Sequence, residues 1–408
     1  MGAPGTTFRA SAGTPSRDQM PGMTVLSPAS ATPPAAGSRI QLLDVLRGVA
    51  ILGTLGTNIW IFTDPLGPAG AIVAPDGTGV VETLLRTLSN GKFLALLTLL
   101  FGVGLELQYR SAERRGRRWP GWYLWRAVLL LAEGALHYLL VFEWDVLMAY
   151  ALVSLLVAGM VGRGDRAVRA CMAVAAVLHV ALIGLLTAAG VGGGGAVPGG
   201  TDLYSTGTYP EQVAARIEGW GLYRSESVLI IPLTILLFLA GSRLMRAGLF
   251  TAGTAGRVLR RRLAVLGLGA GLPLNLLTAF AGPRWYFADR YLCGPLVALG
   301  LMAVVTGLLL RTGDGTGRRA LSGVGRTALS CYVLQNLICA ALCYGWGLGL
   351  AARLDDLRPW WPPAAWAVVS VTLVAGAGWW LRRFDRGPLE AAWHWAYRLP
   401  QRRPRVTG

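Results

Sequence analysis

Apolar segments long enough to cross a bilayer recur along the 408-residue chain, separated by short polar gaps. A transmembrane helix needs about 20 predominantly apolar residues. Ten such segments lie at about 41–63, 81–107, 124–142, 145–162, 168–191, 226–245, 260–281, 290–310, 326–350 and 364–381. We therefore predict an all-α protein: a polytopic transmembrane helical bundle of about ten spans that occupies residues 39–386.

Arginines gather in every second gap between these segments. They cluster at 110–126, 163–169, 243–262 and 311–319, and again after the last segment at 382–386. The gaps between those are poor in basic residues or balanced by acids, as where Arg353 precedes Asp355 and Asp356. Because cytoplasmic loops of membrane proteins carry an excess of arginine and lysine, this alternation predicts that both termini are cytoplasmic.

The two ends of the chain differ from the apolar middle. Residues 1–38 are rich in Gly, Ala, Pro, Ser and Thr and contain no apolar run, so we expect a disordered cytoplasmic tail. Residues 387–408 contain "EAAWHWAYRL" followed by a basic tail, which predicts a cytoplasmic interfacial helix. The longest outer gap, 192–225, contains "YPEQVAARIEGWGLYRSES", and there we expect a short amphipathic helix on the membrane surface.

Composition agrees with a chain surrounded by membrane lipids. Charged residues make up 14%, against about 25% in soluble domains, and the mean hydropathy is +0.49. The net charge of +17 lies in the gaps rather than in a basic stripe interleaved with aromatics, so we expect no nucleic-acid partner. The five cysteines lie in apolar segments without zinc-site spacing, so we expect no metal and no tightly bound cofactor.

Ionisable groups inside a span are costly and mark function, and the densest group lies in "EGALHYLLVFEWDVLMAYAL". Glu133 and His137 are four residues apart and share a helix face, and Asp145 follows across a tight turn. A histidine beside acids can act as a general base. The alternative is a structural hydrogen bond that ties the third span to the fourth.

Two other segments place charges near the ends of spans. Asp44 and Arg47 are three residues apart near the cytoplasmic end of the first span, where they form either an ion pair that orients the helix or a contact for a ligand. Lys92 lies toward the outer end of the second span. It either extends to the surface or faces the bundle and pairs with an acid.

The ninth span also carries polar side chains. Arg326 lies at its start, and Gln335 and Asn336 lie near its middle. Such amides either hold helices together or contact a substrate. His179 stands in an apolar helix without a nearby acid, so we interpret it as structural.

Six segments together resemble the YeiB family of bacterial membrane proteins. They are "LDVLRGVAILG", "GKFLALLTLLFGVGL", "EGALHYLLVFEWDVLMAYAL", "AGSRLMRAGLF", "GVGRTALSCYVLQNLICAALCYGWGLGL" and "GPLEAAWHW", and they run in family order from about residue 39 to 396. The resemblance implies a multi-pass protein of the bacterial cytoplasmic (inner) membrane. The family is similar to a broader group of ten- or eleven-span acyltransferases that includes lysosomal heparan glucosaminide acetyltransferase.

The wider resemblance implies transfer of an acyl group from cytoplasmic acyl-CoA, as co-substrate, to a hydroxyl or amine at the outer face. The acceptor would be a small molecule, a sugar or a lipid. Many related acyltransferases have a histidine toward the outer end of the first span, where this chain has Asn58. The base would then be His137, with Asp145 or Glu133 orienting it and with Lys92 or Asn58 stabilising the oxyanion.

Arginines at the inner ends of the spans would bind the CoA phosphates, because a guanidinium binds phosphate bidentately. Arg47, Arg110 and Arg126 are the candidates. The alternative function is a transporter or flippase of a small molecule or lipid that uses the same polar residues as a proton relay or gate. The sequence indicates no particular oligomeric state.

Overall fold

The computed structural model describes residues 1–2, 36–68, 70, 79–191 and 202–401, and within these ranges every regular element is helical. Of the predicted tail at 1–38, residues 3–35 lie outside the described residues, and the first helix already begins at Ala36. The principal helices are α1 Ala36–Phe62, α3 Val80–Ser89, α4 Lys92–Arg114, α5 Tyr123–Leu140, α6 Leu147–Val161, α7 Asp165–Ala188, α8 Tyr209–Glu218, α9 Trp220–Arg246, α10 Thr254–Ala264, α11 Leu272–Phe280, α12 Tyr286–Ala288, α13 Gly294–Leu309, α14 Thr316–Arg326, α15 Ala328–Cys343, α16 Leu350–Arg353, α17 Trp361–Trp380 and α18 Pro388–Arg398.

Short π-helical and 3₁₀ segments connect some of these helices. The π-helical segment η1 (Val265–Gly271) joins α10 to α11, and η3 (Asp289–Cys293) joins α12 to α13. The 3₁₀ turns are η2 Pro283–Trp285, η4 Asp355–Leu357 and η5 Leu399–Gln401. π-Helical turns of this kind are rare and often occur at functional sites.

Seven helical segments of the described chain are long and apolar enough to cross a membrane, which makes this a multi-pass membrane protein. They are Gln41–Phe62, Val80–Arg114, Asp165–Ala188, Trp220–Arg246, Thr254–Phe280, Pro283–Leu309 and Trp361–Trp380. An eighth is present if α14 and α15, which meet at an 85° bend, count as one broken span.

The predicted number of ten spans is not confirmed by this criterion. The two remaining predicted spans correspond to α5, of 18 residues, and α6, of 15 residues. A helix of 15 residues is about 22 Å long, against a hydrocarbon core of about 30 Å. Helix α5 has the length, but Arg126, Glu133 and His137 lower its hydropathy.

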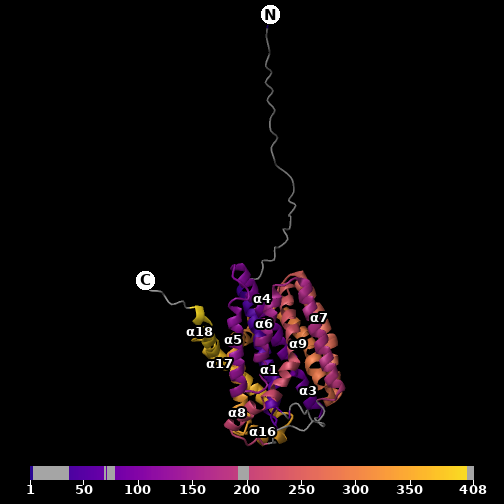
Figure 1. Ribbon diagram of the computed structural model, residues 1–408, viewed down its shortest axis with the longest axis vertical. Helices are drawn as coiled ribbons and strands as arrows, with labels where there is room; N and C mark the ends of the chain where they lie inside the picture. Colours follow the sequence, from indigo (N-terminus) through magenta and orange to yellow (C-terminus); the bar gives the residue numbers. More distant parts are fainter. Residues whose placement is uncertain (3–35, 69, 71–78, 192–201, 402–408) are drawn as a thin grey trace, which may run out of the picture. The chain divides into compact units, whose positions relative to one another are not determined.

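Glycines set the closest helix contacts. A Cβ atom at Gly102 of α4 would lie 2.1 Å from the carbonyl oxygen of Phe238, and one at Gly241 of α9 would lie 2.1 Å from that of Leu99. Helix α1 meets α14 in the same way at Gly48. Small residues that let backbones touch are typical of packing between membrane helices. Figure 1 shows α4, α6 and α9 running side by side, with α8 and α16 at one end of them.

The arginine-rich ends of the helices contact one another. Arg246 of α9 binds Glu106 of α4 at 2.9 Å, and Arg243 of α9 binds Asp165 at the start of α7 at 2.5 Å. Arg326 at the end of α14 donates to the carbonyl oxygen of Asp385, beyond α17. The fold therefore gathers at one end the basic segments that the sequence spaces apart.

The opposite end holds α8 (Figure 1), the first half of the amphipathic helix expected in the long outer gap; the second half, from Trp220, is instead the start of the long helix α9. Arg216 of α8 is 2% exposed, binds Glu143 at 3.3 Å and donates to the carbonyl oxygens of Leu139 and Val141. Tyr204 also donates to Glu143. Because Glu143 lies in the α5–α6 turn, these contacts hold that turn in place.

Candidate functional site

His137 and Asp145 form a buried pair between α5 and α6. His137 lies in the last turn of α5, and its Nδ1 is 3.0 Å from Oδ1 of Asp145. The other carboxylate oxygen, Oδ2, accepts from the backbone amide of Leu147 at 2.9 Å, as a capping acid does at a helix N-terminus. His137 is 3% exposed and Asp145 is 2% exposed. The carboxylate thus fixes both the start of α6 and the orientation of the imidazole.

Two asparagines continue the chain of hydrogen bonds on the other side of the imidazole. Nε2 of His137 lies 3.2 Å from Nδ2 of Asn336, and Nδ2 of Asn58 donates to Oδ1 of Asn336 at 3.1 Å. With the amide nitrogen of Asn336 facing it, Nε2 is an acceptor, so the ring proton is on Nδ1 and is donated to Asp145. That is the tautomer a general base requires.

Tyr332 completes the surroundings of the pair. Its hydroxyl donates to Oδ1 of Asp145 at 3.4 Å, and its ring lies 5.1 Å from the His137 ring. Tyr332 and Asn336 are one turn apart on α15, so a single helix face contacts both ends of the imidazole–carboxylate pair. We call Asn58, His137, Asp145, Tyr332 and Asn336 the histidine site.

Glu133 does not join the hydrogen bonds of the histidine site. Both of its carboxylate oxygens are buried, and neither has a hydrogen-bond partner among the described residues. It interacts electrostatically with Asp145 and with Arg126, two turns away on α5. The prediction of a histidine beside two acids therefore holds directly for Asp145, whereas Glu133 lies between the histidine site and the basic end.

The predicted pair near the start of α1 is present. Arg47 binds Asp44 at 3.0 Å, and the Arg47 side chain is 36% exposed while Asp44 is buried. Asp44 also interacts electrostatically with Arg326, and Arg126 interacts with Arg47. Two arginines, from α1 and α14, thus interact with one acid, and Arg126 of α5 lies close enough to Arg47 to repel it. We call Arg47, Arg126 and Arg326 the arginine group.

Other predicted residues lie elsewhere. Arg110 binds Glu106 at 2.7 Å, in the contact that joins α4 to α9, and is not part of the arginine group. Gln335 is fully buried, and neither polar atom of its side chain has a partner among the described residues. Lys92 is 4% exposed and donates to the carbonyl oxygens of Thr87 and Asn90. It neither reaches the surface nor approaches the histidine site.

Lys92 instead belongs to a second buried polar cluster. Asp289, in η3, interacts with the charge of Lys92 and accepts hydrogen bonds from Asn90 at 2.7 Å and from Asn275 at 2.6 Å. Gly91, between α3 and α4, has a φ of 70°, and a Cβ there would lie 2.1 Å from the backbone oxygen of the residue after Asp289. The break between α3 and α4 therefore depends on this glycine.

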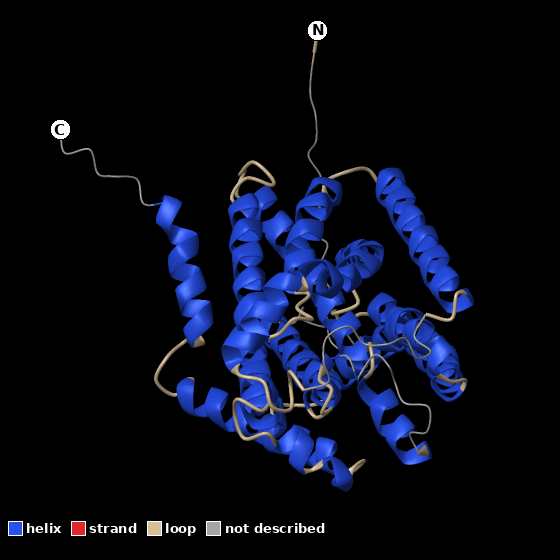
Figure 2. Cartoon of the chain, turned by 60° about the horizontal axis from the view of Figure 1, so that its bottom comes forward, coloured by secondary structure: helices blue, strands red, loops and turns tan. Residues whose placement is uncertain are grey.

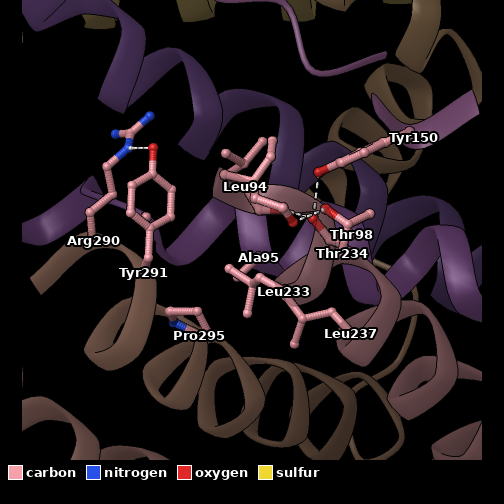
Figure 3. Close-up of a pocket in the computed structure, with 12 residues that line it drawn as sticks. Leu94, Ala95, Thr98, Tyr150, Leu233, Thr234, Leu237, Arg290, Tyr291 and Pro295 are labelled. Atoms are coloured by element: carbon pink, nitrogen blue, oxygen red, sulfur yellow. Dashed lines mark hydrogen bonds between the residues drawn. The ribbon is translucent and has the colours of Figure 1, made fainter. Parts of the chain in front are cut away.

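A small pocket adjoins the second cluster, between α4, α6, α9 and the start of α13 (Figure 3). Arg290 and Tyr291 lie at one end, and Thr98 and Tyr150 lie at the other, joined by a hydrogen bond between their hydroxyls. Tyr150 interacts electrostatically with Asp145. The aliphatic side chains that line the pocket are Leu94, Ala95, Ile230, Leu233 and Leu237.

Several of these residues were not singled out from the sequence. Tyr332 precedes Asn336 by four positions on one apolar helix, and that spacing was the available signal for a shared face. No sequence spacing could have indicated Asp289, because partners such as Asn90 come from distant segments. Within the described residues, no group of three or more His, Cys, Asp or Glu side chains is arranged to hold a metal ion.

Comparison with known proteins places the chain in a family. It is 31% identical to "Uncharacterized protein YeiB" of Escherichia coli (strain K12) over 383 residues, which cover 86% of this chain and 94% of that protein. The chain belongs to the YeiB (DUF418) family. The family model described as "Protein of unknown function (DUF418)" matches residues 244–399, and the resemblance inferred from the sequence motifs is confirmed.

A second relative also matches most of this chain. "Uncharacterized protein YxaH" of Bacillus subtilis (strain 168) is 25% identical over 398 residues, which cover 89% of this chain and 95% of that protein. The relatives are thus bacterial and span nearly the whole length. No solved structure matches this chain.

Proposed function

We propose that the protein is a membrane-embedded acyltransferase that moves an acyl group from cytoplasmic acyl-CoA to a hydroxyl or amine acceptor at the outer face. The observation that carries the proposal is the buried hydrogen-bonded series Asn58–Asn336–His137–Asp145. It joins a general base, the carboxylate that orients it and two amides that can donate to a developing negative charge. A contact that only held helices together would not need an imidazole placed between a carboxylate and an amide.

In the proposed reaction His137 acts as general base. The acceptor hydroxyl or amine takes the place of the Asn336 amide at Nε2 and gives its proton to that nitrogen as it attacks the thioester carbonyl. Asp145 keeps the second ring nitrogen protonated and stabilises the imidazolium that forms. The ring orientation needed for this is the one that the 3.0 Å contact holds.

The Asn336 amide, released from Nε2 and still held by Asn58, donates to the oxyanion of the tetrahedral intermediate. Collapse of that intermediate breaks the carbon–sulfur bond, and His137 returns the proton to the departing CoA thiolate. The new ester or amide bond and the free thiol balance the reaction. This arrangement gives the oxyanion role to the asparagines and not to Lys92, which lies in the second cluster.

The phosphates of acyl-CoA are proposed to bind at the arginine group of Arg47, Arg126 and Arg326. Arg47 and Arg126 repel each other, and Asp44 is the one acid bound to the group by an ion pair in the described chain. A concentration of arginines with so few acids is stabilised by a polyanion. Glu133 lies between this group and the histidine site, and no hydrogen-bond partner for its carboxylate occurs in the described part of the chain. It would contact the donor between its phosphates and its thioester.

The proposed orientation has both termini in the cytoplasm, in the bacterial cytoplasmic membrane, with α5 and α6 each crossing it to complete ten spans. Support comes from the basic gaps and from the contacts that gather them at one end. The turn that holds Glu143 lies at the other end, under α8. Local thinning of the bilayer would accommodate helices as short as α5 and α6.

Transport of a small molecule or lipid is the second candidate, and the second polar cluster favours it. Ionisable groups buried in a span beside a broken helix are typical of transporters, and Asp289 with Lys92 at the Gly91 break fits that description. Asp289→Asn should then abolish uptake into proteoliposomes, whereas the acyltransferase proposal expects acyl transfer to survive this change.

The proposal is tested by thermal unfolding of the purified full-length protein with acetyl-CoA and with longer acyl-CoAs. A bound donor at about 100 times its Kd stabilises the folded state by about 2.7 kcal/mol. We expect Arg126→Ala to lose this stabilisation and Arg110→Ala, at the same end but outside the group, to keep it. His137→Gln should keep the shift and lose transfer. Absence of any shift with every acyl-CoA would refute the proposal.

A further inference from the structure

Helix α18 has two different faces. Glu390, Trp393 and Tyr397 occupy one side, toward the protein. The opposite side carries Ala392 and Trp395 and continues to Leu399, the first residue of η5, at spacings of three and four residues. Trp395 is 58% exposed and Leu399 is 41% exposed. Figures 1 and 2 show α18, the last helix before the C-terminal trace, at the edge of the helical group.

The inner face of α18 is attached to the first turn of α15 through Glu390. Its Oε1 accepts from the backbone amides of Leu329 at 2.7 Å and Ser330 at 3.2 Å, and Oε2 accepts from the Ser330 hydroxyl at 2.5 Å. The amide of Leu389 donates back to the Ser330 hydroxyl at 3.0 Å. A carboxylate from another helix thus caps α15, because the first amides of a helix lack partners of their own.

Helix α15 is the element that supplies Tyr332 and Asn336 to the histidine site. Tyr332 lies two residues after Ser330, so a displacement of the cap acts directly on the helix turn that contacts Asp145. Helix α18 also packs on α5: the Arg126 guanidinium lies 4.6 Å from the Trp393 ring, and Nε1 of Trp125 donates to the backbone of α18 at 3.2 Å. The same helix therefore contacts both α15 and α5, the helices that carry Asn336 and His137.

Positive charge flanks the outer face. The exposed arginines Arg382, Arg383, Arg386 and Arg398 lie just before α18 and at its end. An apolar stripe with a tryptophan, bordered by arginines, is the pattern of a helix that lies in a membrane interface and attracts anionic headgroups. The chain crosses a membrane, so a lipid surface is already adjacent, and the arginines favour an anionic one.

We propose that the outer face of α18 lies in the cytoplasmic leaflet and binds anionic phospholipid, and that Glu390 transmits this binding to α15 and the histidine site. The inference goes beyond the proposed reaction, because it holds for any activity at that site. Lipid composition then controls how firmly α15 is capped.

The test is hydrogen exchange of the full-length protein in nanodiscs of phosphatidylcholine alone or of phosphatidylcholine with phosphatidylglycerol. We expect the amides of residues 388–399 to exchange more slowly with the anionic lipid, by about fivefold for each arginine that engages a headgroup. Added salt should remove the difference. Trp395→Ser should abolish it, and Trp360→Ser, at an exposed tryptophan near the start of α17, should leave it unchanged.

Coupling to the histidine site is measured in the same experiment. The amides of Leu329 and Ser330 should also exchange more slowly with the anionic lipid, and Glu390→Gln should remove that response while residues 388–399 stay protected. Glu113→Gln, at an exposed acid near the end of α4, is the control. Equal exchange in both lipids would overturn the proposal. Protection that followed protein concentration rather than lipid charge would assign the face to a second copy and also overturn it.

Discussion

Replacing Asp145 by asparagine is the sharpest test of the histidine site, because it keeps the shape and changes only the chemistry. Two close donors lie on different oxygens of this carboxylate: Nδ1 of His137 on Oδ1 at 3.0 Å, and the amide of Leu147 on Oδ2 at 2.9 Å. The Tyr332 hydroxyl and the amide of Met148 are farther away, both at 3.4 Å. An asparagine has one acceptor oxygen and one donor nitrogen. It therefore satisfies only one of the two.

Either orientation of the new amide has a cost. If its oxygen stays on Leu147, its nitrogen faces Nδ1 of His137, and the ring proton must move to Nε2, where it faces the amide nitrogen of Asn336. If the amide flips, its nitrogen faces the backbone N–H of Leu147. One hydrogen bond to a charged group is lost in both cases, which costs about 1.5–3 kcal/mol of stability.

Loss of catalysis should be larger than loss of stability. In serine-protease triads, the same replacement leaves the geometry intact and lowers kcat about 10⁴-fold, because the histidine takes the wrong tautomer. A comparable loss here corresponds to about 5.4 kcal/mol of transition-state stabilisation, at 1.36 kcal/mol per tenfold. We expect Asp145→Asn to reduce acyl transfer by between about 10² and 10⁴.

The assay compares transfer from acyl-CoA in proteoliposomes with the thermal unfolding temperature of the same preparation. Asp165→Asn is the matched control, because that carboxylate at the start of α7 is exposed and binds Arg169 and Arg243 at the surface. It should leave transfer unchanged. Transfer by Asp145→Asn within a few-fold of the unchanged protein, at equal folded amounts, would refute the reasoning.

Two further predictions concern the fold. Gly325→Ala should destabilise the protein by about 1–3 kcal/mol, because its Cβ would lie 1.7 Å from the backbone oxygen of Asp44. Gly323→Ala is the control: it lies on the same helix, the nearest contact of its Cβ is at 3.7 Å, and this variant should unfold at the same temperature as the unchanged protein. Equal behaviour of the two variants would contradict the packing of α1 on α14. The backbone amide of Thr208 donates to Glu211 at 2.7 Å and holds the pKa of that carboxyl below its usual value. This bond stabilises α8 fully above the unfolded pKa of about 4.3, and the stabilisation is lost as the pH falls through the lower folded pKa. Hydrogen exchange of residues 209–218 should therefore accelerate in that pH range. Glu211→Gln should remove this pH dependence, and a pH dependence that persisted in the variant would contradict the capping assignment.

Local pattern was enough to predict the elements of this chain. Each predicted apolar segment corresponds to a helix or a run of helices. A segment surrounded by lipid must satisfy its backbone hydrogen bonds within itself, and a helix does so. The helix expected at "YPEQVAARIEGWGLYRSES" is only half right: α8 begins at Tyr209, after a threonine cap, and ends at Glu218, whereas "WGLYRSES" is the start of α9. The segment "EAAWHWAYRL" lies within α18 and η5. The pairing of Asp44 with Arg47 was predictable because it depends only on a spacing of three.

The number of spans was less secure, because length and hydropathy conflict at α5 and α6. Their apolar character is shared with the other spans, but α6 is short and α5 carries the residues of the candidate site. A more apolar α5 would be recognised as a span, but it would lack the polar residues Glu133 and His137 that make it a candidate site. Family membership was also readable from the motifs, since these are local strings.

The sequence by itself determined that this is a helical membrane protein of the YeiB family with His137 and Asp145 close together, because eight residues and one turn separate them. Only the tertiary structure decided what faces the other side of the imidazole, where Asn58 and Asn336 arrive from helices about 280 residues apart in the chain. The same holds for Lys92, whose helix position fitted the histidine site but whose neighbours are Thr87, Asn90 and Asp289. Periodicity fixes the face of a helix on which a residue lies, whereas the partner of that face is set by how the helices pack.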